Sequence, residues 1–127
     1  MIDDLIFSRL TSRTELTNLV ATRVYPGSAP QGVVIPYVVF WLVSSVENAA
    51  HGDGVEAKPV TARYQFDCYA PTSAEMKAIR LQVKNALRGW RVPDTVFGTA
   101  IDDEQDLFDD TLSCDHGILD AFIYHKE

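Results

Sequence analysis

The segment "RVYPGSAPQGVVIPYVVFWLV", residues 23–43, constrains the fold more than any other part of the chain. Its prolines Pro26, Pro30 and Pro36 each lack a backbone N–H donor, and each biases the preceding residue toward extended geometry. A strand inside a sheet must form hydrogen bonds on both sides, so residues 23–36 cannot be an inner strand. We therefore predict a fixed, extended strap across the surface that leads directly into a strand.

The apolar run after the strap predicts a strand that is buried on both faces. One alternating set contains Val38, Phe40 and Leu42, and the other contains Tyr37, Val39, Trp41 and Val43. A strand with one solvent-exposed face would instead alternate with polar residues. We expect the second face to be covered by the strap, by another subunit or by both.

A polar segment, residues 47–58, is predicted to form a loop between this strand and the next. Strict alternation follows in "VTARYQFDCY" and predicts a strand with one buried face. The residues expected to face inward are Val60, Ala62, Tyr64, Phe66 and Cys68, and those expected to face outward are Thr61, Arg63, Gln65 and Asp67.

Helical spacing of apolar residues predicts helices near both residues 2–10 and 16–20, and Ser12 with Glu15 has the form of a capping box for the second. The clearest helix follows Thr72, its predicted N-cap, and ends at Gly89. Its apolar stripe is Met76, Ile79, Val83, Ala86, Leu87 and Trp90, and its opposite, basic face is Lys77, Arg80, Lys84 and Arg88.

The remainder fits two strands, about residues 95–106 and 112–124, with a turn near Asp109 and Asp110. Strands with short connections and segregated helices indicate an α+β fold. We predict an antiparallel sheet of about four strands with helices packed on one face, in a single domain covering residues 1–127.

Composition excludes several classes of function. The chain has 127 residues, 46% of them hydrophobic, and a net charge of -7, which counts against a protein that grips nucleic acid. Its longest apolar run is too short to cross a bilayer as a helix, so we expect no membrane association. The two cysteines lack a CxxC spacing and are predicted to be free thiols.

We find no pattern that predicts catalysis, a cofactor or a bound metal. The histidines at 51, 116 and 125 have no ligand spacing. Asp102, Glu104 and Asp106 match positions 1, 3 and 5 of a calcium loop, but Leu107 and Ser113 replace its glycine and glutamate. A small metal-dependent or acid–base enzyme is the alternative from another functional class.

Charge segregation suggests assembly. The basic helix face and the acidic residues Asp102, Asp103, Glu104 and Asp106 have opposite signs. They could meet between neighbouring subunits, and such a heterologous contact closes into a ring when its rotation allows. Pairing within one chain, or exposure to water, is the other possibility. The candidate interface residues are Tyr37, Val39, Trp41, Lys77, Arg80, Lys84 and Arg88.

Several segments in order resemble one family over nearly the whole chain. The most specific residues are Arg23, Tyr25, Pro26, Pro30, Pro36 and Tyr37, and "YQFDCYAPTSAEMKAIRLQVKNAL" follows later. Together they resemble the tail completion proteins of long-tailed phages, also called tail terminators or head-to-tail joining proteins. Those proteins have an α+β fold and form a six-fold ring at the head-proximal end of the tail tube.

The resemblance implies a non-enzymatic virion protein, assembled in the host cytoplasm and located at the tail–head junction of a phage, a prophage or a related particle. Its expected partners are copies of itself in a hexamer, the tail tube protein and the head connector, and another neck component is the alternative. DNA would pass through the ring without specific binding, along a lumen for which Asp102, Asp103, Glu104 and Asp106 are candidates. The loop candidates for tube or connector contact are His51, Gly52, Asp53 and Gly54.

Overall fold

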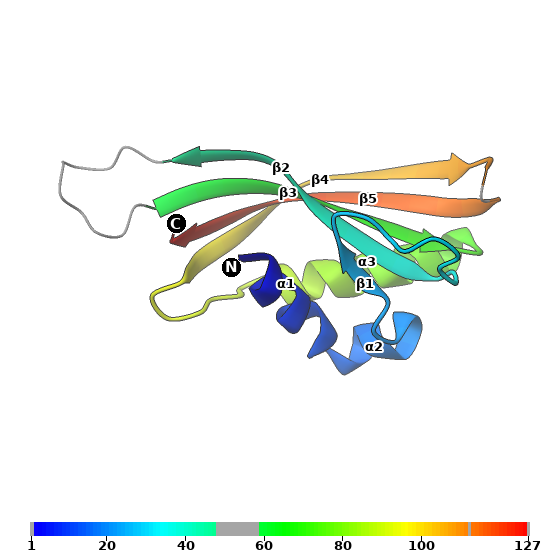
Figure 1. The fold of residues 1–127 in the computed structure, drawn as a ribbon, viewed down its shortest axis with the longest axis horizontal. Coiled ribbons are helices and arrows are strands. Elements are labelled where there is room, and N and C mark those ends of the chain that lie inside the picture. Colours follow the sequence, from blue (N-terminus) through cyan, green and yellow to red (C-terminus); the bar gives the residue numbers. More distant parts are fainter. Residues whose placement is uncertain (1, 48–58, 112, 127) are drawn as a thin grey trace.

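A computed structural model of the chain describes residues 2–47, 59–111 and 113–126, so the loop candidates at positions 51–54 lie outside the described residues. The described residues form an α+β fold in which the helices lie together on one side of a single sheet (Figure 1). The elements in order are α1 (Ile2–Thr11), α2 (Thr14–Val20), β1 (Val24–Pro26), β2 (Tyr37–Glu47), β3 (Pro59–Ala70), α3 (Ser73–Leu87), β4 (Val96–Asp109) and β5 (Cys114–Lys126).

The sheet has five strands in the order β1-β2-β3-β5-β4, so the expectation of about four antiparallel strands was incomplete. The additional strand is β1, which comes from the strap and pairs in parallel with β2. It lies at the sheet edge, so no neighbouring strand needs the backbone N–H that Pro26 lacks. The other neighbouring strands are antiparallel, as predicted.

The hydrophobic core lies between the helices and the inner face of the sheet. All five residues of β3 that were predicted to face inward are buried, and Val38 and Phe40 of β2 are buried beside them. The predicted stripe of α3 is buried against the same face. The pattern of apolar residues therefore located the core correctly.

The ends of α3 follow the predicted local chemistry. The hydroxyl of Thr72 accepts a hydrogen bond from the backbone N–H of Glu75 at 3.2 Å, as expected of an N-cap. Gly89 adopts a φ of 68°, in the left-handed region that ends helices and favours glycine. No helix among the described residues has the length and apolarity needed to cross a membrane.

The capping box predicted for α2 is absent. The N-cap of α2 is Arg13, which makes no side-chain cap. The Ser12 hydroxyl instead donates a 2.8 Å hydrogen bond to the carbonyl of Arg9. The prediction was wrong because a serine between two helices can satisfy a free carbonyl of the first as easily as a free N–H of the second.

The second half of β2 is not buried in a single chain, although burial on both faces was predicted. Residues 37–40 are buried, whereas every residue from 41 to 47 is exposed. An α-helix rises about 1.5 Å per residue and a strand about 3.3 Å, so the 15-residue α3 cannot cover the full length of these strands. At the end where β2 finishes and β3 begins, the strands reach beyond the helices (Figure 1).

Candidate functional site

Backbone hydrogen bonds fix the strap against the start of β2. The carbonyl of Arg23 accepts from the N–H of Val38 at 2.9 Å, and the N–H of Gly27 donates to the carbonyl of Phe40 at 2.8 Å. The Arg23 side chain donates through Nε to the carbonyl of Pro36, also at 2.8 Å. Arg23, one of the residues on which the family resemblance rests, therefore joins the two ends of the strap.

Aromatic rings form a row across the outer face of the sheet, which is the face opposite the helices. Tyr25 and Tyr37 have ring centroids 6.3 Å apart, and Tyr37 stacks on Tyr69 of β3 at 4.7 Å. Tyr69 stacks in turn on His116 of β5 at 4.2 Å. The register places Tyr37, Tyr69 and His116 opposite one another on adjacent strands, which brings these rings together.

A buried carboxylate lies beside this row. Asp67, predicted to face outward, does so but is only 8% exposed. Its oxygens accept hydrogen bonds from Trp41 Nε1 at 3.3 Å and from Gln65 Nε2 at 2.8 Å, and His116 Nε2 lies 3.5 Å away. Residues 27–29 of the strap and this part of the sheet border a hollow of about 430 Å³, so the strap does cover part of the second face of β2.

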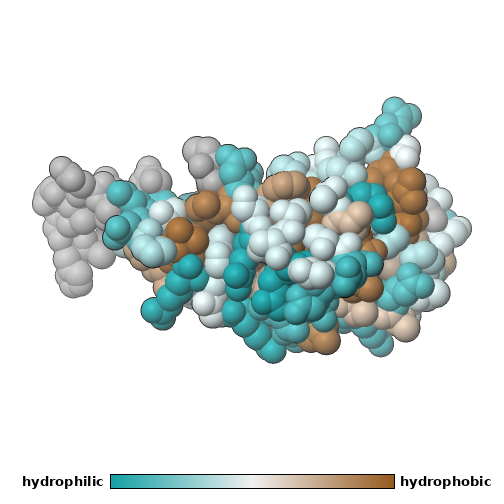
Figure 2. Space-filling model, turned by 90° about the horizontal axis from the view of Figure 1, so that it is seen from below, coloured by the Kyte–Doolittle hydropathy of each residue, from teal (hydrophilic) through white to brown (hydrophobic). Residues whose placement is uncertain are grey.

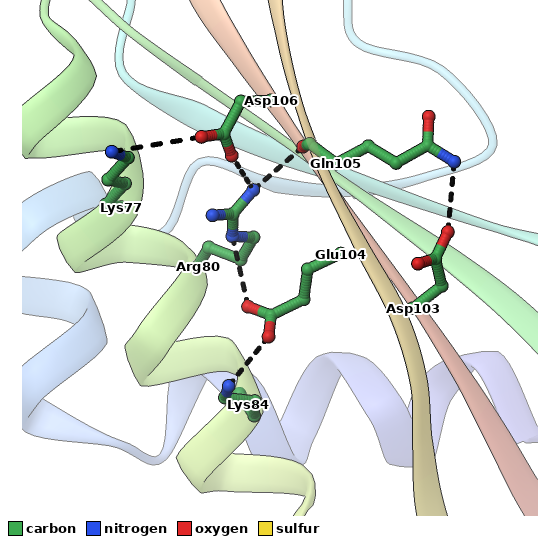
Figure 3. Close-up of polar contacts among 7 residues, drawn as sticks. All are labelled: Lys77, Arg80, Lys84, Asp103, Glu104, Gln105 and Asp106. Carbon is green, nitrogen blue, oxygen red and sulfur yellow. Dashed lines mark hydrogen bonds and ion pairs between the residues drawn. The ribbon is translucent and has the colours of Figure 1, made fainter.

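The basic residues of α3 and the acidic residues of β4 meet within one chain (Figure 3). Arg80 Nη1 donates to the backbone carbonyl of Gln105 at 2.8 Å and to Asp106 Oδ1 at 2.5 Å, and its Nε lies 3.2 Å from Glu104 Oε1. Lys84 bonds to Glu104 at 2.8 Å, and Lys77 lies 3.8 Å from Asp106. The basic and acidic side chains therefore pair within one chain, which was one of the two alternatives that the sequence left open.

Arg80 was expected on an exposed helix face, but it is buried and only 9% exposed. The reason is the neighbouring edge strand, which lies beside α3 and covers it with Glu104 and Asp106. Arg88 keeps its exposed position just beyond the last residue of α3.

The four acidic candidates for a lumen do not form one surface. Alternation along β4 directs Glu104 and Asp106 toward α3, while Asp103 shares the outer face with Asp120, its partner in the register (Figure 3). Asp102 lies 3.3 Å from Arg63 Nη2, which also contacts Asp120 at 3.4 Å. Asp102 and Asp103 are therefore the members that belong to the outer face.

Exposed apolar side chains gather on β2 beyond the strap. β1 pairs only with residues 38–40, so in the described part of the chain the rest of β2 has a strand neighbour on one side only. The exposed apolar residues there are Trp41 (38%), Leu42 (47%), Val43 (42%) and Val46 (59%). Seen from the helix side, the molecule is mostly hydrophilic in its middle and shows hydrophobic residues toward its ends (Figure 2).

Cys68 and Cys114 are free and buried, and burial raises the pKa of both thiols, which disfavours the reactive thiolate. Within residues 2–47, 59–111 and 113–126, no three His, Cys, Asp or Glu side chains gather as ligands for a metal. The carboxylates with calcium-loop spacing lie on strand β4 and two of them pair with α3.

Sequence reasoning missed the cluster around Asp67. An aspartate at an outward position of an alternating strand indicates solvent exposure, and nothing local shows that the strap folds back over it. The signal that was available is the high aromatic content of the same face, since Tyr37, Trp41 and Tyr69 belong to the outward sets.

The chain is similar to known proteins over nearly its whole length. A family model described as "Tail completion protein gp17" matches residues 4–125. A solved structure entitled "Virion of native gene transfer agent (GTA) particle" contains a chain with 17% sequence identity and a TM-score of 0.72, and the match covers 96% of this chain and 92% of that one. At this identity, the likeness establishes the fold. No curated protein matches the sequence.

Proposed function

Because the chain belongs to the tail completion protein gp17 family, we propose that it caps the head-proximal end of a phage tail tube as a ring of identical subunits. In this role it ends polymerisation of the tube and provides the surface to which the head connector joins. Its partners are then other copies of the chain in a hexamer, the tube protein and the connector. DNA passes through the ring, and the protein resides at the tail–head junction after assembly in the bacterial cytoplasm.

Two findings support a structural protein of a phage tail. The family model covers almost the whole chain, and the similar solved fold comes from a phage-like virion particle. Both favour a structural component over an enzyme.

The observation that carries the proposal is the uncovered half of β2. An edge strand with apolar side chains on both faces invites pairing with another chain, and monomeric proteins normally protect such edges with charges, prolines or short strands. Here the prolines and β1 protect only the start of β2. We infer that residues 41–47 are covered by a neighbouring subunit in the assembled ring.

The distribution of charge supports the same location for the subunit interface. Arg80 and Lys84 have partners within the chain, so their charges are less available to a neighbour than the sequence suggested. Tyr37 and Val39 are already buried, whereas Trp41 is exposed. Among the interface candidates, we therefore favour Trp41 and the residues that follow it on β2.

Electron microscopy of particles made without this gene tests the role directly. We expect filled heads beside separate, overlong tails, and normal particles after the purified protein is added back. Tails of normal length that remain unattached would assign the protein to the neck, and ordinary particles would refute a role in assembly.

A matched pair of substitutions tests the proposed interface. Leu42 on β2 and Leu81 on α3 are the same residue type with nearly equal exposure, 47% and 46%. We expect Leu42→Glu to prevent rescue of joined particles and Leu81→Glu to permit it, because a buried carboxylate without a partner is costly. Equal rescue by both variants would contradict an interface on β2.

For the lumen, we propose Asp102 and Asp103, which share the outer face, since an anionic surface would keep DNA phosphates from adhering. Replacing both with lysine should slow DNA ejection from complete particles, and the effect should shrink as salt is raised. Unchanged ejection at low salt would remove these residues from the lumen.

A further inference from the structure

The hollow between the strap and the outer face has the chemistry of a binding site. Residues 27–29 form one side of it, and Tyr37, Val39, Trp41 and Tyr69 form its aromatic and apolar surface. Asp67 contributes the charged group. The hollow of about 430 Å³ is therefore an open site with one carboxylate among aromatic rings.

Among the described residues, Asp67 has no permanently charged cation as a partner. Its two hydrogen-bond donors, Trp41 and Gln65, are neutral. His116 Nε2 lies 3.5 Å from Asp67 Oδ1 without a hydrogen bond and forms an ion pair with it only when the imidazole is protonated. No Lys or Arg in the described ranges forms an ion pair with it. Since carboxylates this deeply buried are normally paired, the site favours a cation supplied from outside.

The outer face around the hollow also favours a cation. Asp102, Asp103 and Asp120 lie on it, and Arg63 is the cation that pairs with two of them. An acidic face of this kind attracts a basic segment of another protein.

We propose that this hollow binds an arginine side chain presented by a partner protein. A guanidinium group is planar, so it can stack on an aromatic ring and at the same time direct its N–H donors at a carboxylate. Trp41 provides the ring, because Tyr69 is already stacked between Tyr37 and His116, and Asp67 provides the carboxylate. This inference goes beyond the capping role and does not depend on it.

The experiment uses the full chain labelled with ¹⁵N and follows its two indole N–H signals by NMR. The Trp41 indole donates to Asp67 and reports on the hollow, whereas Trp90 is buried in the core and serves as an internal reference. The probe is N-acetyl-arginine methylamide, added at millimolar concentrations. Blocked citrulline, which has nearly the same shape without the charge, is the control ligand.

We expect a saturable shift of the Trp41 signal with blocked arginine, affinity about tenfold weaker with blocked citrulline, and a stationary Trp90 signal. Absence of a saturable shift would overturn the proposal, and so would equal affinity for citrulline. Tighter binding of blocked lysine would overturn the assignment to arginine. A Trp41 shift that depends on protein concentration without ligand reports the subunit contact proposed for β2, so all ligand titrations are compared at one fixed protein concentration.

Two variants locate the binding. Asp67→Asn retains an oxygen that accepts from Trp41 but removes the charge, so we expect about a tenfold loss of affinity. Asp103→Asn removes a charge from the same face outside the hollow, and we expect affinity within about twofold of the unaltered chain. An unchanged Trp90 signal shows that each variant is folded, and undiminished binding by Asp67→Asn would refute the site.

Discussion

Replacing Arg80 with methionine should destabilise the fold far more than replacing the neighbouring Lys77. Arg80 is 9% exposed and joins α3 to β4 through the Gln105 carbonyl, Asp106 and Glu104. Methionine keeps most of the buried aliphatic stem, so the change isolates the polar contacts from the loss of packing. Lys77 is well exposed, and its ion pair with Asp106 has a longer separation of 3.8 Å.

The magnitude follows from the exposure of each partner. A hydrogen bond to a charged group contributes about 1.5–3 kcal/mol when buried, but an ion pair with an exposed partner contributes about 0.2–1 kcal/mol. The side chains of Asp106 and Glu104 are 50% and 34% exposed, so their two contacts belong near the lower range. With the carbonyl of Gln105, we expect Arg80→Met to cost about 2–3 kcal/mol and Lys77→Met less than about 0.5 kcal/mol.

Urea unfolding of the two variants, followed by circular dichroism, measures both costs. Raising the salt to about 1 M should remove most of the Lys77 effect, whereas the buried part of the Arg80 effect should persist. Equal destabilisation by the two substitutions would refute the reasoning, because it would mean that burial of the guanidinium group does not matter. A loss of less than about 0.5 kcal/mol of unfolding free energy in Arg80→Met would also refute it.

Three other substitutions test separate parts of the fold. Gly117→Ala should cost about 1–3 kcal/mol in urea unfolding because its Cβ would collide with Met76 Sδ, and adding Met76→Ala should remove most of that cost but not the part due to Arg80 Nη1, 3.2 Å from the new Cβ. Thr72→Ala should cost about 1 kcal/mol in the same assay through loss of the N-cap, while Thr72→Ser should be close to neutral. Burial and the 2.6 Å hydrogen bond to Asp3 raise the pKa of Tyr64, so the folded state holds the phenolic proton more tightly than the unfolded state. That stabilisation is complete below the ordinary tyrosine pKa of about 10 and declines above it, and Tyr64→Phe should make the fall in urea midpoint between about pH 9 and 11 shallower.

Local patterns in the sequence predicted the parts of the fold that depend on local physics. Alternation in β3 and the stripe of α3 identified buried residues because each element buries one face against the other. The strap was correctly excluded from the sheet interior, although its three-residue pairing with β2 was not foreseen. A pairing this short leaves no periodic signal in the sequence.

Apart from the capping box at Ser12, the errors concern contacts between distant segments. The burial of Arg80 depends on where β4 lies relative to α3, and the exposure of Leu42 depends on the relative lengths of the helices and strands. Neither can be predicted from the residues that are adjacent in sequence to Arg80 or Leu42. The division of Asp102 to Asp106 between two faces could have been anticipated from alternation alone, apart from the irregular register between Ile101 and Asp103.

The brevity of β1 has a geometric consequence for whatever strand joins β2. An added strand can advance along the free edge only until it meets β1 beside Phe40, where the chain already occupies the hydrogen-bonding positions. That obstruction acts as a physical stop and limits how far two chains can overlap. In the proposed ring, the strap would therefore set the overlap between neighbouring subunits by contact at the tip of β1 alone, without pairing with the added strand.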